Sequence, residues 1–230
     1  GKAITTGASN VIAGSGAGEV LTSGTSNVVI GKNAGVSLTD NNNNVVIGTQ
    51  AFDAANGGEH NNIAIGSHAL GAEITGAAYC IAIGHLALSA QTGGTDAKNI
   101  AIGGLAGDNI GGATENTLVG YMAGSNISAG NSNTALGHTA YMDGTGTANT
   151  VVGGDACRGA MSGANNTVMG HAAGMALTDG PGNVLIGKSA GTAMNTGDYN
   201  VAIGYQAADG LVGDANYNIA IGSNALGGCT

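Results

Sequence analysis

The residues of this chain that could act as nucleophiles or soft metal ligands are three cysteines. Thiolates serve as catalytic nucleophiles, bind metals and form disulfides. The chain consists of repeats of about 17 residues, and Cys80 and Cys157 lie more than four repeats apart. This separation exceeds the reach of a disulfide. We therefore expect both to be reduced thiols, and Cys229 to be placed where it can pair between chains. The set is consistent with assembly in a reducing compartment followed by exposure outside the cell.

Five histidines are the next candidate ligands. His85, His138 and His171 each directly follow a repeated Gly and therefore share one edge of the expected fold. Successive members of this row lie three and two repeats apart, about 14 and 10 Å, which is too far for one metal ion to bind within a chain. Copies of one His around a symmetry axis are the alternative, but this edge is expected on the outside. With His60 and His68 outside the row, we predict no metal site and no cofactor.

Fourteen acidic residues could supply the paired carboxylates of a glycosidase. No two recur at matching positions in an insertion long enough to form a cleft, and neither HExxH nor a Ca²⁺-binding GGxGxD repeat is present in the sequence. We interpret the acids as solvated loop charges and predict no catalytic residue and no enzymatic activity. Those between the repeated segments include Asp40, Glu59, Glu73, Asp96, Glu115, Asp179, Asp198 and Asp214.

One nine-residue sequence phrase recurs along the chain. Its repetition determines where the cysteines, histidines and acidic residues lie in the fold. It reads Asn, Val/Ile/Thr, an apolar residue, Ile/Val/Leu, Gly, two variable residues, Ala, and a small or apolar residue, as in NVVIGKNAG from Asn27. Thirteen copies, one of which begins with Cys80, cover residues 10–226, and their glycines are 16 to 19 residues apart. A period this regular predicts a single repeat domain over residues 1–230. The repeated glycines are Gly14, Gly31, Gly48, Gly66, Gly84, Gly103, Gly120, Gly137, Gly153, Gly170, Gly187, Gly204 and Gly222.

Each repeat has the length and composition of one coil of a parallel β-solenoid. Gly and Asn every few positions exclude a repeat built from helices. The residues before each Gly are β-branched or small, which is typical of a short strand. About 17 residues are too few for a helix-turn-helix or a propeller blade. We therefore predict an all-β fold, a β-roll of about thirteen stacked coils in which the repeated Gly turns a corner with positive φ.

The composition favours a thin core and excludes several classes of protein. With 45 Gly, 6 Tyr, one Phe and no Trp, the core must be filled mainly by Ala, Val, Ile and Leu. A chain that is 43% hydrophobic with a net charge of −9 does not match a disordered polypeptide. Five basic residues are too few for a nucleic-acid partner. Since no run of about 18 apolar residues occurs, we predict no membrane insertion.

Side chains alternate along a strand, so phrase positions two and four face one way and position three the other. Position four is the most uniformly bulky, and we predict that it points into the coil. Apolar residues seven after the Gly would supply the opposite wall, and the Ala three after it would fit a tight turn. Position four includes Ile30, Ile47, Ile65, Ile83, Ile102, Ile186, Ile203 and Ile221, and the opposite wall includes Leu21, Leu38, Ile110, Ile127, Leu177, Met194 and Leu211.

Position three would then face outward, yet it is apolar in all thirteen copies. A strand that is apolar on both faces is buried on both faces, and a stripe of this extent is too large to leave exposed on a soluble monomer. We therefore predict that position three forms an interface between copies of the chain, which threefold symmetry would close around an axis. The predicted oligomer interface is Ile12, Val29, Val46, Ala64, Ala82, Ala101, Leu118, Ala135, Val151, Val168, Leu185, Ala202 and Ala220.

Position one is Asn in twelve of the thirteen copies. Stacked side-chain amides can hydrogen-bond from coil to coil. We interpret these residues as a structural Asn ladder rather than a ligand surface. The ladder comprises Asn10, Asn27, Asn44, Asn62, Asn99, Asn116, Asn133, Asn149, Asn166, Asn183, Asn200 and Asn218.

The recurring Asn-[Val/Ile/Thr]-Ala-Ile-Gly phrase resembles the head repeats of YadA-like trimeric autotransporter adhesins and the related repeats of bacteriophage tail fibres. The resemblance covers nearly all of the chain. It implies a trimer of parallel β-rolls, left-handed in the adhesin heads, that attaches to a surface. The coils here are longer than the adhesin repeat and closer to the phage-fibre versions.

We therefore expect a structural or adhesive fibre protein, a homotrimer on a virion tail or in an extracellular, cell-surface location, with a host receptor or glycan as its further partner. A phage tail fibre fits better than a bacterial adhesin. The alternative is a self-assembling extracellular filament whose subunits stack end to end, because the repeat runs almost to residue 230 without a polar capping repeat. An ice-binding solenoid fits less well, because Thr occupies position two in only four consecutive coils, at Thr117, Thr134, Thr150 and Thr167.

Overall fold

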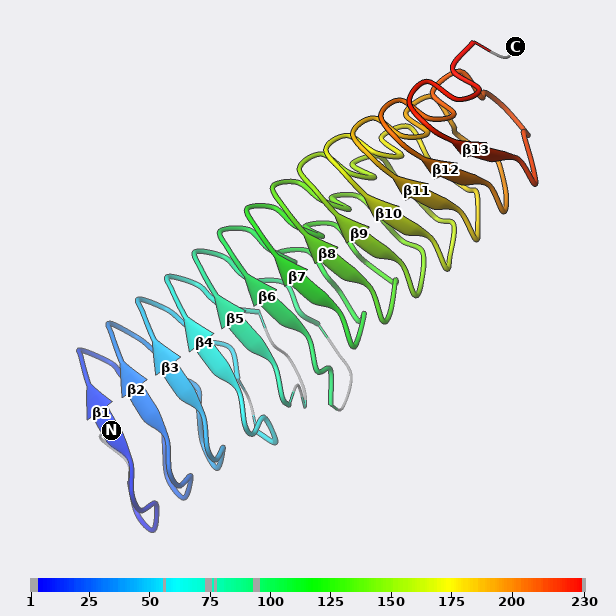
Figure 1. Cartoon of the computed structure of the whole chain (residues 1–230). Helices are drawn as coiled ribbons and strands as arrows, with labels where there is room; N and C mark the ends of the chain where they lie inside the picture. The colour runs from blue at the N-terminus through cyan, green and yellow to red at the C-terminus, as the bar shows by residue number, and fades with distance from the viewer. Residues whose placement is uncertain (1–3, 56, 73–75, 77, 93–95, 229–230) are drawn as a thin grey trace. The chain divides into compact units, whose positions relative to one another are not determined.

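The computed structural model describes residues 4–55, 57–72, 76, 78–92 and 96–228, and it confirms an all-β parallel β-solenoid (Figure 1). Its residues group into two compact units, Gly1–Asn116 and Thr117–Thr230, here called the first and second units. The described part of the chain contains no helix, and hence none that is long and apolar enough to cross a membrane.

Every strand is three residues long and consists of phrase positions two to four. Within each unit, consecutive strands pair in parallel and in register, so that Val28 lies between Val11 and Val45. The first unit contains β1 (Val11–Ala13), β2 (Val28–Ile30), β3 (Val45–Ile47), β4 (Ile63–Ile65), β5 (Ile81–Ile83) and β6 (Ile100–Ile102), and the second contains β7 (Thr117–Val119), β8 (Thr134–Leu136), β9 (Thr150–Val152), β10 (Thr167–Met169), β11 (Val184–Ile186), β12 (Val201–Ile203) and β13 (Ile219–Ile221).

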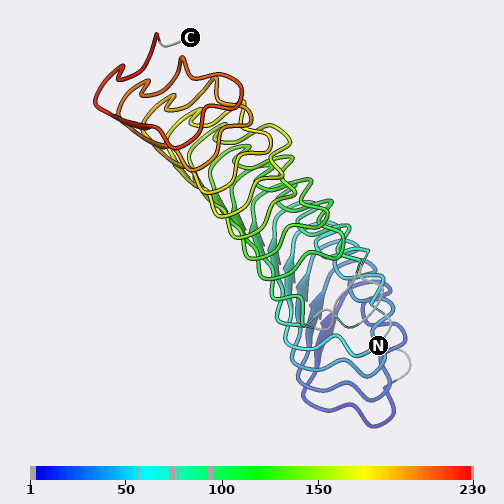
Figure 2. The same ribbon diagram turned by 90° about the vertical axis from the view of Figure 1, so that its right-hand side faces the viewer.

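The turns between strands are also paired from coil to coil. The Gly35 N donates to the Ala51 carbonyl at 2.9 Å, in the same way that the Gly31 N donates to the Ala13 carbonyl at 2.8 Å beside the strand. Figure 2 shows the coils of each unit following nearly the same path. Each coil forms hydrogen bonds with the backbone groups of its neighbours. Irregular turns can therefore be packed without leaving backbone N–H and C=O groups unsatisfied.

The repeated glycines turn the corner after each strand, as predicted. Their φ angles lie between +122° and +141°, a region that residues with a Cβ rarely adopt. The corners are also crowded, because a Cβ built on Gly153 would meet the backbone carbonyl of Gly170 in the next coil. Both the conformation and the close approach therefore require glycine at this position.

Three further positions in most coils are left-handed, which the sequence did not predict. They are the second and fourth residues after the corner Gly, such as Gln50 (φ +54°) and Phe52 (φ +49°), and the residue before the ladder Asn, such as Ser26 (φ +59°). A non-glycine residue costs roughly 1 kcal/mol in this region. The stacked backbone bonds must offset that cost in every coil.

The core is filled by two positions that exchange volume between coils. Where the fourth residue after the corner is Gly, the seventh is bulky: a Cβ on Gly124 would lie 2.6 Å from Cδ1 of Ile127. In the coils of Phe52 and Tyr141 the fourth residue is bulky and the seventh, Ala55 or Gly144, is small, and the Tyr141 ring occupies the space that a side chain on Gly144 would need. Each of these coils therefore holds one large side chain against its outer turn, whereas the coil of Leu88 buries both Leu88 and Gln91. The predicted opposite wall from Leu21 to Leu211 is confirmed as buried, as are the predicted turn alanines from Ala17 to Ala207.

Candidate functional site

The structure reverses the predicted assignment of strand faces. The middle residue of each strand, position three, points into its own coil and is at most 2% exposed in every strand after β1. These side chains are already covered by their own chain, so they do not form an oligomer interface. The corrected residues are Val29, Val46, Ala64, Ala82, Ala101, Leu118, Ala135, Val151, Val168, Leu185, Ala202 and Ala220, together with Ile12, which is half-buried.

Positions two and four face outward and form what we call the outward face of each unit. In the first unit it consists of Val and Ile, with one Ala, and Ile30 and Ile102 remain 38% exposed. The prediction that position four points into the coil is therefore wrong. The first unit's outward face is Val11, Ala13, Val28, Ile30, Val45, Ile47, Ile63, Ile65, Ile81, Ile83, Ile100 and Ile102.

The outward face of the second unit has the same register but a mixed composition. Position two is Thr from β7 to β10 and Val or Ile from β11 to β13, while position four stays apolar. Leu136 is 47% and Met169 45% exposed. This face is Thr117, Val119, Thr134, Leu136, Thr150, Val152, Thr167, Met169, Val184, Ile186, Val201, Ile203, Ile219 and Ile221.

Aromatic pairs flank the outward face of the second unit. At the end where strands begin, Tyr199 and Tyr217 stack with ring centroids 5.5 Å apart. At the end where strands finish, Tyr121 stacks on His138 at 5.6 Å, and Lys188 lies 5.9 Å from the Tyr205 ring. Half-exposed aromatic rings beside an apolar face are typical of protein interfaces.

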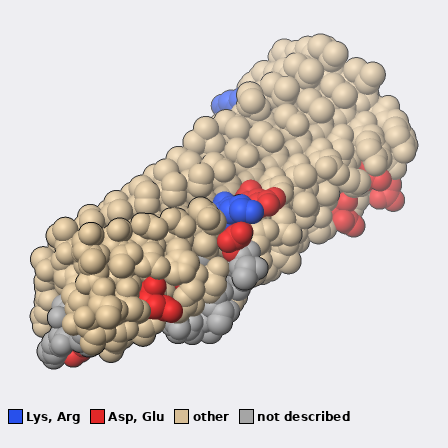
Figure 3. Space-filling model, turned by 90° about the horizontal axis from the view of Figure 1, so that it is seen from below, with Lys and Arg blue, Asp and Glu red and all other residues tan. Residues whose placement is uncertain are grey.

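Charge is sparse over this surface. None of the described strands contains a charged residue. Figure 3 shows a different side of the molecule, seen from below, on which Lys, Arg, Asp and Glu also occupy only small patches. The outward faces are thus uncharged, and they are apolar at position four in every strand. A surface of this kind can associate with another apolar surface.

The Asn ladder lies inside the coils. Asn183 donates from its backbone N to Oδ1 of Asn166 at 2.8 Å, and Asn200 donates in the same way to Asn183 at 2.9 Å. Asn183 Nδ2 also reaches across to the Gly197 carbonyl at 2.8 Å. The side-chain amides form their hydrogen bonds within the fold, and most of them are buried. They therefore present no ligand surface.

Replacing Asn183 by Ala should lower the free energy of unfolding of the second unit by about 2–3 kcal/mol, because the Asn200 N and the Gly197 carbonyl would lose buried partners. Asn126→Ala, on an exposed side chain, should cost less than about 1 kcal/mol. Urea unfolding followed by circular dichroism measures both. Equal effects of the two substitutions would show that the ladder does not stabilise the fold.

The two described cysteines are buried and form no disulfide. Cys80 takes the place of a ladder Asn, and its backbone N still donates to Oδ1 of Asn62 at 2.8 Å. Burial raises the pKa of the Cys157 thiol to about 12. Burial also raises the pKa of Tyr141, whose hydroxyl donates to the Gly146 carbonyl and accepts from Asn149 Nδ2. Cys157 lacks the low pKa of a nucleophilic thiol, and both thiols lack the exposure. Cys229 lies outside the described residues.

The raised pKa of Cys157 predicts a loss of stability in alkali. Between the ordinary thiol pKa of 9.0 and about 12, the unfolded chain releases a proton that the folded unit keeps. The free energy of unfolding should therefore be unaffected by this thiol below pH 9 and fall by about 1.4 kcal/mol per pH unit above it. Urea unfolding between pH 7 and 11 should show a shallower decline for Cys157→Ala than for the wild type. Parallel declines would contradict the prediction.

The histidines and acids do not converge on a site. His171 Nε2 lies 3.9 Å from Asp155, and among the described residues no group of three His, Cys, Asp or Glu side chains could hold a metal ion. Glu59 departs from the expected solvated charge: it is fully buried and accepts from Asn41 Nδ2 at 2.5 Å, the Gly57 N at 2.8 Å and the Gly76 N at 3.1 Å. Glu59 therefore acts as a structural acceptor. Glu73 lies outside the described residues.

Comparison with known proteins found no matching family model, no matching curated protein and no matching solved structure.

Proposed function

We propose that this chain is a structural fibre protein whose outward faces pack against copies of itself, as a trimer, to form a shaft that attaches to a surface. The observation that carries the proposal is the outward face of each unit, which is apolar at position four in every strand and free of charge. Apolar faces of this extent on soluble proteins mark sites of association. Three copies around one axis would bury one such face from each chain.

The attachment role and its location, on a virion tail or outside the cell, rest on the resemblance of the repeated phrase to adhesin heads and phage tail fibres. That resemblance also implies a left-handed coil. Because a solenoid by itself does not fix a function, these parts of the proposal depend on the repeat phrase rather than on the fold.

Size-exclusion chromatography with light scattering tests the assembly. The double variant Leu136→Asp/Met169→Asp places two charges on the outward face of the second unit and should elute as a folded single chain. Ser128→Asp adds a charge at an exposed position outside the strands and should assemble like the wild type. A wild type that elutes as a single chain would contradict the proposal.

Negative-stain images of the same samples separate the proposed assembly from the alternative. Discrete particles of uniform length are expected for a trimeric shaft. Filaments that lengthen with protein concentration would instead identify end-to-end stacking of subunits.

A further inference from the structure

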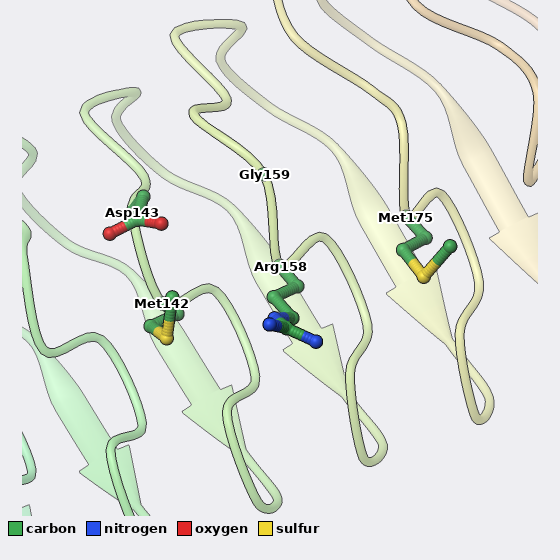
Figure 4. A pocket seen from close by; sticks show the side chains of 5 residues that line it. All are labelled: Met142, Asp143, Arg158, Gly159 and Met175. Carbon is green, nitrogen blue, oxygen red and sulfur yellow. The ribbon is translucent and has the colours of Figure 1, made fainter.

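A shallow depression lies on the turns of three consecutive coils of the second unit, away from the strands (Figure 4). Met142, Arg158 and Met175 are each the fifth residue after a corner Gly, so they follow one another along a column, while Asp143 and Gly159 occupy the next position in their coils. The depression has a volume of about 380 Å³ and is open to solvent. We call it the Arg158 depression.

The hollow exists because Gly159 has no side chain. A Cβ at this position would lie 3.3 Å from the Met175 carbonyl oxygen, so a larger residue would both crowd the backbone and fill the space. The corresponding residues of the flanking coils, Asp143 and Ala176, do carry side chains. Gly159 therefore keeps the middle of the depression open, between Met142 and Asp143 of the preceding coil and Met175 of the following one.

Arg158 supplies the hydrogen-bond donors of the depression. It is the only arginine of the chain, and its side chain is 55% exposed. Among the described residues its one charged partner is Asp155, at 3.6 Å from a single guanidinium nitrogen. A guanidinium carries five N–H donors, so most of them remain available to a ligand.

Asp143 supplies an acceptor on the preceding coil. Its Oδ1 accepts from Asn126 Nδ2 at 2.6 Å, which fixes the carboxylate, and its Oδ2 has no partner among the described residues. The thioethers of Met142 and Met175 add apolar, adaptable contacts on either side of the guanidinium (Figure 4). The depression thus presents a donor, an acceptor and two apolar surfaces together.

The charge balance selects the class of ligand. Asp143 and Asp155 more than offset the positive charge of Arg158, and the chain carries a net charge of −9, so a polyanion would be repelled. A cation would meet the guanidinium. A neutral ring with several hydroxyls is compatible with both the guanidinium and the carboxylate. One hydroxyl accepts from Arg158, another donates to Asp143, and the C–H faces of the ring pack on the methionines.

We propose that the Arg158 depression binds a neutral hexose unit of a glycan. This inference rests on the attachment role proposed above and names its ligand class and site. A single open site of this kind binds weakly, and repetition of the site in an assembly would raise the avidity.

Nuclear magnetic resonance titration provides a direct test, because the single arginine gives one Nε–Hε signal and the two methionine methyl groups can be assigned by substitution. The probes are maltose, cellobiose and lactose, with galacturonate as the anionic comparison. At least one neutral disaccharide should shift the Arg158 and methionine signals in a saturable way. Arg158→Gln and Asp143→Asn should each weaken binding by about tenfold or more, since each removes a hydrogen bond to a charged group.

Lys188→Gln is the matched control, because it removes an exposed cation of the same unit outside the depression, and it should leave binding unchanged. The inference is overturned if no disaccharide shifts these signals at its solubility limit, if galacturonate binds as well as the neutral sugars, or if Lys188→Gln weakens binding as much as Arg158→Gln. Light scattering on the same samples separates the two proposals: sugar binding by a monomer contradicts the assembly alone, and assembly without sugar binding contradicts this site alone.

Discussion

Replacing Gly153 by Ala should destabilise the second unit by more than about 4 kcal/mol, whereas Gly154→Ala, one residue later, should change its stability by less than about 0.5 kcal/mol. Gly153 has a φ of +135°, and a Cβ there would collide with the backbone of Gly170, which the stacking of coils holds in place. At Gly154 the nearest atom to an added Cβ is Cδ2 of His171, at 3.7 Å, an ordinary contact.

Urea unfolding monitored by circular dichroism measures both variants against the wild type. The pair is matched in chemistry and in position along the chain, so general effects of adding a methyl group cancel. Similar losses for the two variants would show that the corner geometry does not require glycine at one position more than at its neighbour.

Val168→Asp should prevent the second unit from folding, while Met169→Asp should leave it folded. Val168 is fully buried at the centre of β10, and a carboxylate there would have no partner, which costs several kcal/mol even when the group is neutralised. Met169 is 45% exposed on the outward face, so its replacement can keep the charge in water. Association with other copies should be lost in the Met169 variant.

Thermal unfolding by circular dichroism and light scattering distinguish these outcomes. A folded Val168→Asp together with an unfolded Met169→Asp would restore the original assignment, in which position three faces outward. If both variants were folded and assembled like the wild type, neither face would be part of an interface.

The coil and its corners were predictable because one residue type at a fixed interval leaves few physical alternatives. A Gly every 16 to 19 residues after a β-branched segment predicts a stacked strand that ends in a positive φ. The register of the ladder also followed from sequence, because Asn27 and Asn10 occupy the same phrase position and bond directly.

The strand faces were predicted wrongly because side-chain size was taken as the mark of burial. Small residues such as Ala64 and Ala101 face the interior in some coils while the larger Ile65 and Ile102 face outward, and Leu118 and Leu185 fill the same interior position in others. The Asn ladder indicated which face of each strand points inward. Asn62 and Ala64 lie two residues apart and therefore on the same side of the strand, and an Asn that bonds within the coil directs Ala64 inward.

The pairing of one large and one small core residue in a coil was also predictable from the sequence, from a weaker pattern. Phe52 and Tyr141 stand four residues after a corner where several other coils have Gly, and Ala55 and Gly144 stand where those coils have a bulky residue. The Arg158 depression could not be predicted, since it depends on which side chains three neighbouring coils bring to one column. The burial of Glu59 likewise depends on Gly57 and Gly76, from its own turn and the following one.

Sedimentation equilibrium of the wild-type chain at micromolar concentration shows whether the outward faces are covered by other copies, because it reports mass without assuming a shape. If the outward faces are covered by other copies, the mass should be three times the 21.9 kDa of one chain, and Leu136→Asp/Met169→Asp should return it to that of a single chain. A wild type that sediments as a stable 21.9 kDa species would contradict the account.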